Sequence, residues 1–297
     1  MYSLSDSERL LIETSLEYDF DNGHDARLFT DYWFGGWVFD HNIDPPWQIA
    51  CHHAKQTQIV LIGGTGSGKT VFAGMSAFCW AATTHHFKFL DVAPTQFQAR
   101  QMYDAVVTRI EGTRAARIVT KTIEKPYPKI TVAHDGIGVS TLEFMSTDKN
   151  ANTILSGEGD FVNYDEAGLD EELDQTMIRL STRLRGSIHD RPRLGRMQLT
   201  TNPHINPWLY FLFDMADDDP DNCLSVLVKS RQNKNITPAQ LRQMTSHIPE
   251  DERDQWLEGA RPEGQGKEFP QNLIDMCQDP GLNEIMRVGL GGVPEVG

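Results

Sequence analysis

The chain has 297 residues, which fits one large α/β domain with extra segments, or two domains. Hydrophobic residues make up 39% and charged residues 23%, as in ordinary globular proteins, and no apolar run is long enough to cross a bilayer. The net charge of −15 argues against a protein that binds nucleic acid over its whole surface. Any contact with DNA would need a local basic patch or an added domain.

Cysteine usage and the N-terminus indicate where the protein resides. Cys51, Cys79, Cys223 and Cys277 form no CxxC pair, so we expect free thiols in a reducing compartment. The first residues lack the basic-then-apolar pattern of a signal peptide. A cytosolic protein is therefore expected.

The predicted elements begin with a capped helix near the N-terminus. Ser5 to Glu8 forms a capping box ahead of the apolar residues between Leu10 and Leu16, which predicts an amphipathic helix. Phe29 to Phe39 is rich in aromatic residues and glycine and is expected to pack against the main domain. Asp44-Pro45-Pro46 then breaks the chain.

Strands and helices alternate in the next part of the chain. Gln58 to Ile62 is apolar and β-branched, which predicts a buried strand, and a glycine-rich loop separates it from a helix over Lys69 to Ala82. Phe87 to Val92 predicts a second strand, followed by a helix from about Gln96 to Glu111. This alternation is typical of a parallel sheet.

A hairpin and further strands follow. Lys129 to Val132 and Gly138 to Phe144 flank a glycine turn and predict an antiparallel hairpin. The remaining predicted elements are strands over 160–164, 195–201 and 224–228 and a helix over about 171–184. After Lys229 the pattern becomes helical, because Thr237 supplies an N-cap before Pro238 and a second helix opens near Pro249.

The predicted fold is therefore α/β, with a mostly parallel sheet, helices on both faces and an inserted β-hairpin near 129–145. The predicted organisation is an N-terminal helical or irregular segment (1–45), a core (46–230) and a C-terminal helical linker region (231–297).

One segment matches a phosphate-binding motif without a mismatch. Gly63-Gly64-Thr65-Gly66-Ser67-Gly68-Lys69-Thr70 follows G-x-x-x-x-G-K-[ST] between the first predicted strand and its helix. The glycines let successive backbone N–H groups turn toward one anion, at the positive end of that helix. Lys69 is predicted to reach the β- and γ-phosphates of ATP, and the Thr70 hydroxyl to ligate Mg²⁺. An ordinary glycine-rich turn is the alternative.

Two acidic residues end a later apolar strand. At such a position Asp165 would hold the magnesium ion, and Glu166 would polarise the water that attacks the γ-phosphate. Alone, the pair could be a solvated strand end, but together with the P-loop it favours a hydrolase over a kinase. This prediction assumes that the strand before the P-loop and the strand before Asp165 lie side by side.

Polar residues also end the next strand. Thr200, Thr201 and Asn202 would lie at the carboxyl edge of the sheet, where they could sense the γ-phosphate, although an Asn-Pro turn would have the same sequence. Gln48 lies ahead of the first strand, and its carboxamide could bond adenine.

A cation is needed to offset charge in the transition state of phosphoryl transfer. The densest basic run is Arg179, Arg183, Arg185, Arg191, Arg193 and Arg196. Arg179 and Arg183 are four residues apart and share a helix face. We predict an arginine finger among Arg179, Arg183 and Arg185, with a solvated or phosphate-facing patch as the alternative.

Together these motifs resemble the ATPase part of the large terminase subunit of tailed bacteriophages. The matching segments are Pro46 to Gln48 (adenine motif), Gly63 to Thr70 (Walker A), Ala93 to Gln96 with Gln98-Ala99 (the strand–helix segment behind it), Phe161 to Glu166 followed by Ala167 to Leu169 (Walker B), Thr182 to Gly186 (before the coupling strand), Thr200 to Pro203 with Pro207 to Leu209 (coupling motif and its following helix), and Trp256 to Gly259 with Gly266 to Pro270 (linker). The resemblance covers about residues 44–275, and only the combination is specific.

The resemblance implies a motor that hydrolyses ATP with Mg²⁺ and drives double-stranded DNA into a procapsid. The implied partners are double-stranded DNA, the portal protein, the small terminase subunit and further copies of the chain in a ring. No membrane partner is expected, and the implied location is the cytoplasm of the infected bacterial host.

Terminases of this type also carry a C-terminal nuclease domain. The acidic residues after position 215 look like loop and helix-start charges, so nuclease activity is not expected from these residues. We expect either a shortened chain or a motor whose nuclease is a separate chain.

Two departures from the family pattern affect the arginine finger. Many terminases carry an arginine inside Walker A, where this chain has Gly64, Thr65 and Gly66, and an Arg-Gly before Walker B, where it has Leu155-Ser156-Gly157. The prediction therefore rests on Arg179, Arg183 and Arg185.

Two other functions fit part of the pattern. A helicase-like translocase would need a second RecA-like domain, for which about 90 residues after position 205 are too few. A P-loop nucleotide switch would not depend on Glu166 for turnover.

Overall fold

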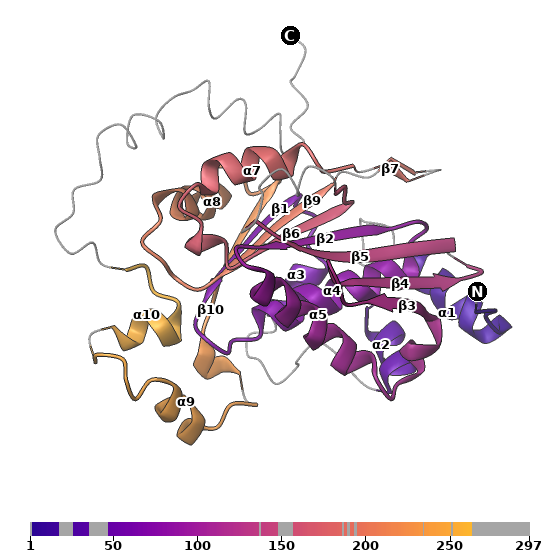
Figure 1. Ribbon diagram of the computed structural model, residues 1–297, viewed down its shortest axis with the longest axis horizontal. Helices are drawn as coiled ribbons and strands as arrows, with labels where there is room; N and C mark the ends of the chain where they lie inside the picture. The colour runs from indigo at the N-terminus through magenta and orange to yellow at the C-terminus, as the bar shows by residue number, and fades with distance from the viewer. Residues whose placement is uncertain are drawn as a thin grey trace, which may run out of the picture.

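A mostly parallel sheet with helices on its two faces forms the main body (Figure 1). The computed structural model describes residues 2–17, 26–35, 47–136, 138–147, 157–185, 187–188, 191–192, 195–233, 235–250 and 252–262. Several predicted segments lie outside these residues, namely Pro46, Leu155-Ser156, Gly186, Arg193 and Gly266 to Pro270.

The described elements follow in chain order. The helices are α1 (Asp6–Glu17), α2 (Ala26–Phe34), α3 (Trp47–His52), α4 (Lys69–Thr83), α5 (Gln96–Ile110), α7 (Leu173–Ser181), α8 (Pro207–Asp218), α9 (Pro238–Met244) and α10 (Arg253–Glu258), with the 3-10 turns η1 (Arg114–Ile118), η2 (Ala167–Leu169) and η3 (Ser230–Gln232). The strands are β1 (Gln58–Gly63), β2 (Lys88–Ala93), β3 (Val119–Ile123), β4 (Lys129–His134), β5 (Gly138–Ser146), β6 (Phe161–Asp165), β7 (Ser187–Ile188), β8 (Arg191–Pro192), β9 (Arg196–Thr201) and β10 (Cys223–Val228).

Eight of the described strands form one sheet in the order β10-β1-β9-β6-β2-β5-β4-β3. Neighbours from β10 to β5 run parallel, and the β5–β4 and β4–β3 pairs are antiparallel. The α/β fold and the hairpin near 129–145 are therefore confirmed. Strand β3, which extends the hairpin edge, was not predicted.

The predicted adjacency of the P-loop strand and the Asp165 strand is wrong. Strand β9 lies between β1 and β6 and pairs in parallel with both, with Gln58 opposite Met197 and Phe161 opposite Arg196. An apolar pattern identifies a buried strand but does not fix its position in the sheet, which depends on contacts between segments far apart in the chain. Here a strand that comes later in the chain occupies the middle.

Two hydrophobic cores cover the two faces of the sheet. All six residues of β1 are buried, because an inner parallel strand has helices on both sides. Ile59 and Leu61 join the core formed with α4 and α5, while Val60 and Ile62 join the core formed with α7 and α8. Figure 1 shows these two helix layers on opposite sides of the sheet.

The ends of the described chain also follow their local sequence signals. The Glu8 carboxylate accepts bonds from the backbone N–H and the hydroxyl of Ser5 (both 2.8 Å), which confirms the predicted cap. Trp33 is fully buried, and Thr237 caps α9 as expected.

Cys51, Cys79 and Cys223 are buried free thiols, whereas Cys277 lies outside the described residues.

Candidate nucleotide-binding site

The P-loop joins the carboxyl end of β1 to the first turn of α4. Gly66 and Gly68 have φ angles of 76° and 93°, a left-handed conformation that strongly favours glycine. Gly68 is also the N-cap of α4, and no side chain caps that end of the helix. The free N–H groups of this first turn face the carboxyl edge of the sheet, where an anion would meet the positive end of the helix.

Lys69 is buried at the start of α4 and is only 6% exposed. Its ammonium group donates to four oxygens, namely the carbonyls of Gly63 (2.7 Å) and Gly64 (3.1 Å), Oγ of Ser67 (3.2 Å) and Oδ1 of Asn202 (3.1 Å). Burial lowers the pKa of Lys69 to about 8, and the negative charges of Glu166 and Asp165 partly oppose this. The loop therefore keeps a cation at the place where a polyphosphate would need one.

Thr70 of α4 meets Asp165 although β1, the strand before the P-loop, is not adjacent to β6. The Thr70 hydroxyl lies 3.2 Å from Oδ2 of Asp165, and the Thr200 hydroxyl donates to Oδ1 of Asp165 at 2.6 Å. Burial raises the pKa of Asp165 to about 6; the Thr200 bond and Lys69 lower it, and the charge of Glu166 raises it further. Thr200 of the intervening strand β9 thus donates a hydrogen bond directly to the carboxylate that is predicted to bind the metal.

Glu166 is held in an uncommon conformation at the end of β6. Its φ of 52° is left-handed, which is costly for a residue with a side chain and is typical of functional positions. The carboxylate of Glu166 accepts the backbone N–H of Asn202 (3.4 Å) and the Asn202 side-chain amide (3.3 Å). Since Asn202 also accepts from Lys69, one carboxamide links the P-loop cation to the proposed general base.

The other predicted residues lie at the same edge of the sheet. The Thr201 hydroxyl accepts the N–H of Gly168 (3.0 Å) and donates to the carbonyl of Asn202 (2.9 Å), so it braces the turn after Asp165. Gln48 is buried against the P-loop, with its Nε2 3.5 Å from the carbonyl of Gly68. Its role toward adenine remains a proposal.

The predicted arginines lie away from this site in the same chain. The N–H of Gly159 donates to the carbonyl of Arg183 (3.1 Å), and the N–H of Arg185 donates to Gly159 (2.9 Å). Gly159 precedes β6, and Asp165 ends it, so the two places are roughly 20 Å apart along the extended strand. A finger from Arg183 or Arg185 would have to act on a neighbouring copy. Arg179 lies on α7.

Arg196 is not part of a surface basic patch. It is 8% exposed, bonds the carbonyls of His52 and Ala54 at the end of α3, and lies over the rings of Trp80 and Phe161. Its guanidinium joins α3 to the sheet. The side chain of Arg191 lies outside the described residues.

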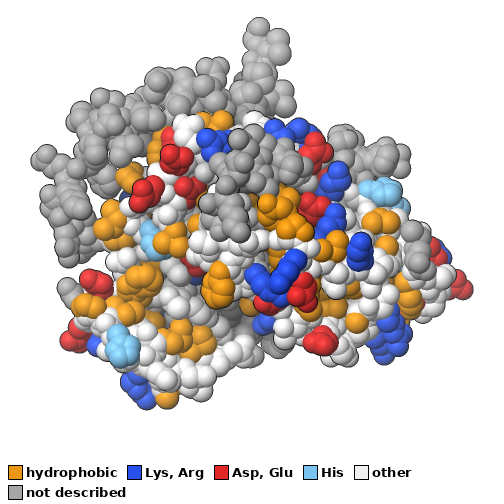
Figure 2. All heavy atoms as spheres, in the orientation of Figure 1, with side chains coloured by type: hydrophobic (Ala, Val, Ile, Leu, Met, Phe, Trp, Pro, Cys, Tyr) orange, Lys and Arg blue, Asp and Glu red, His pale blue; other side chains and the backbone are white. Residues whose placement is uncertain are grey.

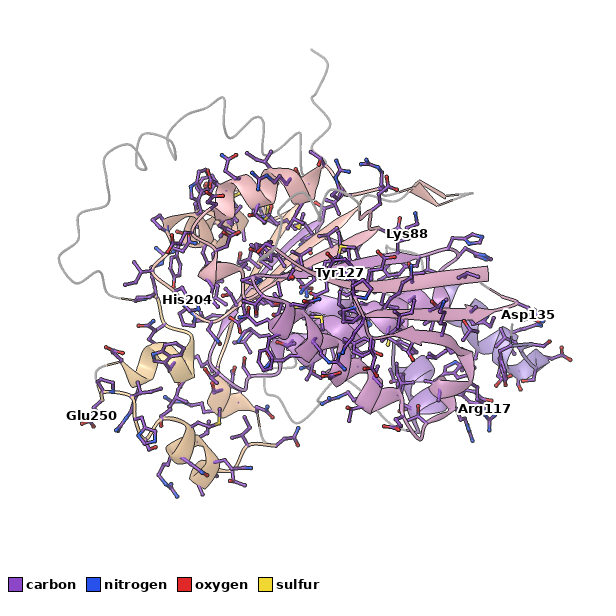
Figure 3. The ribbon with its side chains drawn as sticks, in the orientation of Figure 1. Lys88, Arg117, Tyr127, Asp135, His204 and Glu250 are labelled. Carbon is purple, nitrogen blue, oxygen red and sulfur yellow. The ribbon has the colours of Figure 1, made fainter. Side chains whose placement is uncertain are left out.

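The segment after β10 contacts the P-loop, which the sequence did not predict. Ser230 donates to the carbonyl of Thr65 (2.7 Å) and Asn233 to that of Gly66 (2.8 Å). The N–H of Thr65 donates in turn to the carbonyl of Trp256 (2.9 Å). Figure 3 shows His204 at the sheet edge beside α10, where its ring meets Trp256 edge-on with 6.3 Å between centroids. The P-loop is therefore supported from residues far along the chain.

A buried polar row under α4 was also missed. Asp91, Asn163 and Gln198 lie in register on β2, β6 and β9, and none is more than 1% exposed. Their sequence signal is a polar residue in the middle of each of three apolar strands, which a buried sheet does not need for packing.

The residues of the site fit a magnesium-bound nucleoside triphosphate. Hydroxyl and carboxylate oxygens, such as those that meet at Thr70 and Asp165, are the ligands that Mg²⁺ prefers. The left-handed glycines, the free helix start and the buried ammonium of Lys69 suit phosphate oxygens. These residues could therefore hold the phosphates of such a ligand and its metal ion.

A P-loop between a buried parallel strand and a helix, with an acidic strand end two strands away, defines the class of P-loop NTPases. Comparison with solved structures agrees. The large terminase ATPase domain of Thermus phage P74-26 is 18% identical, with a TM-score of 0.51 over 72% of this chain and 92% of that chain. The large terminase of the thermophilic bacteriophage D6E in complex with ADP is 16% identical (TM-score 0.52; 69% of this chain, 48% of that chain), and that of bacteriophage HK97 is 13% identical (TM-score 0.52; 75% and 54%).

The fold is therefore similar to that of phage large terminase ATPase domains, as the resemblance implied. The matched region spans about half the length of the D6E and HK97 chains. A scan against models of protein families found no match, nor did a search of curated proteins. Within the described residues, no helix is both long and apolar enough to span a membrane.

Proposed function

We propose that this chain is the ATP-hydrolysing motor of a large terminase, which drives double-stranded DNA into a procapsid. The observation that carries the enzymatic part is the convergence of Lys69, Thr70, Asp165, Glu166 and Asn202 at one edge of the sheet. The similarity of the fold to terminase ATPase domains supports the motor part.

The residues divide the chemistry between them. The P-loop N–H groups and Lys69 bind the phosphates, with Lys69 exchanging its present oxygens for those of the ligand. Thr70 and Asp165 would hold Mg²⁺, which neutralises charge on the phosphate oxygens. Glu166 accepts a proton from the attacking water.

The loss of the γ-phosphate is sensed at the end of β9. Thr201 and Asn202 lie between the P-loop and Glu166, and they are followed by Pro203, whose carbonyl accepts the Gln255 side chain of α10 (3.2 Å). A change at Asn202 is thereby passed to the C-terminal linker region, which moves relative to the core and advances the DNA.

The assembled motor is a homo-oligomeric ring on the portal protein, with the small terminase subunit as a further partner in the host cytoplasm. An arginine of a neighbouring copy completes each site, with Arg183 and Arg185 as the candidates and Arg179 as the third. Figure 2 shows basic side chains close to acidic ones in the middle of one face. Ion pairs such as Arg100–Glu124 and Lys88–Glu158 also place basic side chains beside acidic ones. Because the chain has a net charge of −15, contact with DNA is expected from the assembled ring.

Substitution of the general base tests the enzymatic proposal. Glu166→Gln should keep ATP binding and lose hydrolysis by at least about a hundredfold, because a general base contributes roughly that factor. Glu111→Gln, at the exposed end of α5, is the matched control and should hydrolyse ATP like wild type. Phosphate release and calorimetric ATP binding measure the two quantities; unchanged turnover in Glu166→Gln would instead indicate a nucleotide switch.

The motor proposal needs a separate experiment. The chain, ATP and portal-bearing procapsids are mixed with double-stranded DNA, and DNase-resistant DNA is measured. Protected DNA in wild type but not in Glu166→Gln is expected. ATP-driven strand separation without protected DNA would favour a helicase-like translocase.

A further inference from the structure

Three buried side chains form a directed hydrogen-bond chain beneath the P-loop helix. Gln198 Nε2 donates to Oδ1 of Asn163 (3.0 Å), and Asn163 Nδ2 donates to Oδ1 of Asp91 (2.8 Å). The same Asn163 Nδ2 lies 3.4 Å from the Thr200 hydroxyl, which donates to Asp165. Through Thr200, the three side chains are therefore linked to Asp165, the carboxylate that is proposed to hold the metal.

The orientation of the Asn163 carboxamide decides where the Thr200 proton goes. A hydroxyl has one proton, and with an N–H₂ group facing it the oxygen accepts, so its proton is left for Asp165. If the carboxamide were turned over, its oxygen would face Thr200 and compete with Asp165 for that proton. Asparagine can adopt either orientation, and its neighbours select one.

Asp91 selects the observed orientation by accepting from the N–H₂ group of Asn163, and Gln198 supports it by donating to the Asn163 oxygen. Asp91 is fully buried, and its carboxyl offers an oxygen to Asn163 whether or not it is ionised, so the N–H₂ group turns toward it. Its second oxygen, Oδ2, is buried without a hydrogen-bond partner. Phe89 and Phe161 on the neighbouring positions of β2 and β6 are apolar, so packing alone does not call for an acid here.

We propose that Asp91 is a positioning residue for the metal site: it fixes the carboxamide of Asn163 so that Thr200 donates to Asp165. This inference rests on the proposed function, since it assigns a role toward the magnesium that Thr70 and Asp165 would hold. Asp91 acts through Asn163 and Thr200 and does not touch the nucleotide.

The test measures how strongly Mg²⁺ tightens ATP binding, by calorimetry with MgCl₂ and with EDTA. Asp91→Leu removes the acceptor at similar volume, and Gln198→Met removes the donor to Asn163 at nearly the same shape. Both should bind ATP in EDTA like wild type and lose about tenfold of the Mg²⁺ enhancement, as supporting bonds behind metal ligands typically contribute. Asp91→Asn keeps an acceptor and should retain the wild-type enhancement.

The outcomes separate this proposal from the proposed function. The proposal is overturned if Asp91→Leu and Gln198→Met both show the wild-type Mg²⁺ enhancement. It is also overturned if Asp91→Asn loses as much of the Mg²⁺ enhancement as Asp91→Leu, because Asp91 then does not act through an acceptor bond. If Asp91→Leu does not fold, Gln198→Met decides. If wild type itself shows no Mg²⁺ enhancement, the nucleotide site is wrong as a whole.

Discussion

Asn202 joins the two residues on which the proposed chemistry depends. Its side-chain oxygen accepts from Lys69, and its N–H groups hold the carboxylate of Glu166. A ligand that draws Lys69 onto its phosphates removes one of these bonds, so the carboxamide is then held only from the side of Glu166. Occupation of the P-loop and alignment of the base are thereby coupled through one residue.

Removal of that carboxamide should uncouple them. Asn202→Ala is expected to lower kcat by up to about a hundredfold, since a misplaced base loses roughly that factor, while the Kd for ATP changes little. Asn222→Ala, in the exposed turn before β10, is the matched control. Phosphate release and calorimetry give the two constants, and an unaltered kcat would remove Asn202 from the mechanism.

Asp91 should also leave a signature in the pH dependence of stability. Burial raises the pKa of Asp91 well above its usual range, and the charge of Asp165 adds to this. Above pH 4 the unfolded chain releases this proton and the folded chain keeps it. Rising pH therefore destabilises the wild-type fold, by about 1.4 kcal/mol per unit, until the folded pKa is reached.

Asp91→Asn removes this dependence. Its Tm should exceed that of wild type increasingly as pH rises from 4 toward neutrality. Thermal unfolding of the two proteins without nucleotide, at matched pH values, measures the difference. A difference that stays constant with pH would mean that Asp91 is ionised in the folded protein.

At the scale of elements, the P-loop depends on backbone conformation more than on side chains. Gly68 has a φ of 93°, and a Cβ there would lie 3.2 Å from Nε2 of Gln48. Gly112, after α5, is also left-handed, at 76°, but a Cβ there would meet nothing within 4 Å. A side chain at either position would therefore be forced into a left-handed backbone conformation, but only at Gly68 would it also meet a neighbouring side chain.

This pair allows a controlled substitution. Gly68→Ala and Gly112→Ala should each lose about 1–2 kcal/mol of stability from the left-handed backbone. Only Gly68→Ala should also weaken ATP binding, because the added Cβ would press on Gln48 beside the loop, whereas Gly112 has open space around it. Denaturant unfolding and ATP titration test both statements; equal ATP affinity in the two variants would contradict the role assigned to this turn.

Many of the helices and strands could be predicted from the sequence. The strand before the P-loop, the hairpin and the capped start of α9 follow from local patterns, and all three are confirmed. The place of β9 between β1 and β6 could not be predicted, because sheet order depends on contacts between distant segments. The same holds for the burial of Arg196 and for the contact between Ser230 and the P-loop.

At the scale of the whole molecule, Arg183 and Arg185 lie near the amino end of β6 and the proposed catalytic residues lie at its carboxyl end. Two such surfaces on one chain can meet only between copies. An arginine that acts across an interface makes turnover depend on assembly.

Specific ATPase activity should therefore rise with protein concentration. Substitution of the arginine finger, by Arg183→Ala or Arg185→Ala, should abolish this rise. The same substitution should lower kcat by about a thousandfold. Arg117→Ala, at an exposed position of η1, should behave as wild type. Flat activity per chain in all variants would mean a monomeric enzyme and a wrong finger assignment.

The strands that flank β1 have a consequence for synthesis of the protein. The P-loop strand is made early, but its two neighbours, β9 and β10, and the Ser230 that holds Thr65 are made much later. A nascent chain therefore carries every residue of the P-loop long before it carries the sheet that shapes it. Since such distant contacts form last, an incomplete chain on the ribosome should neither bind nor consume ATP.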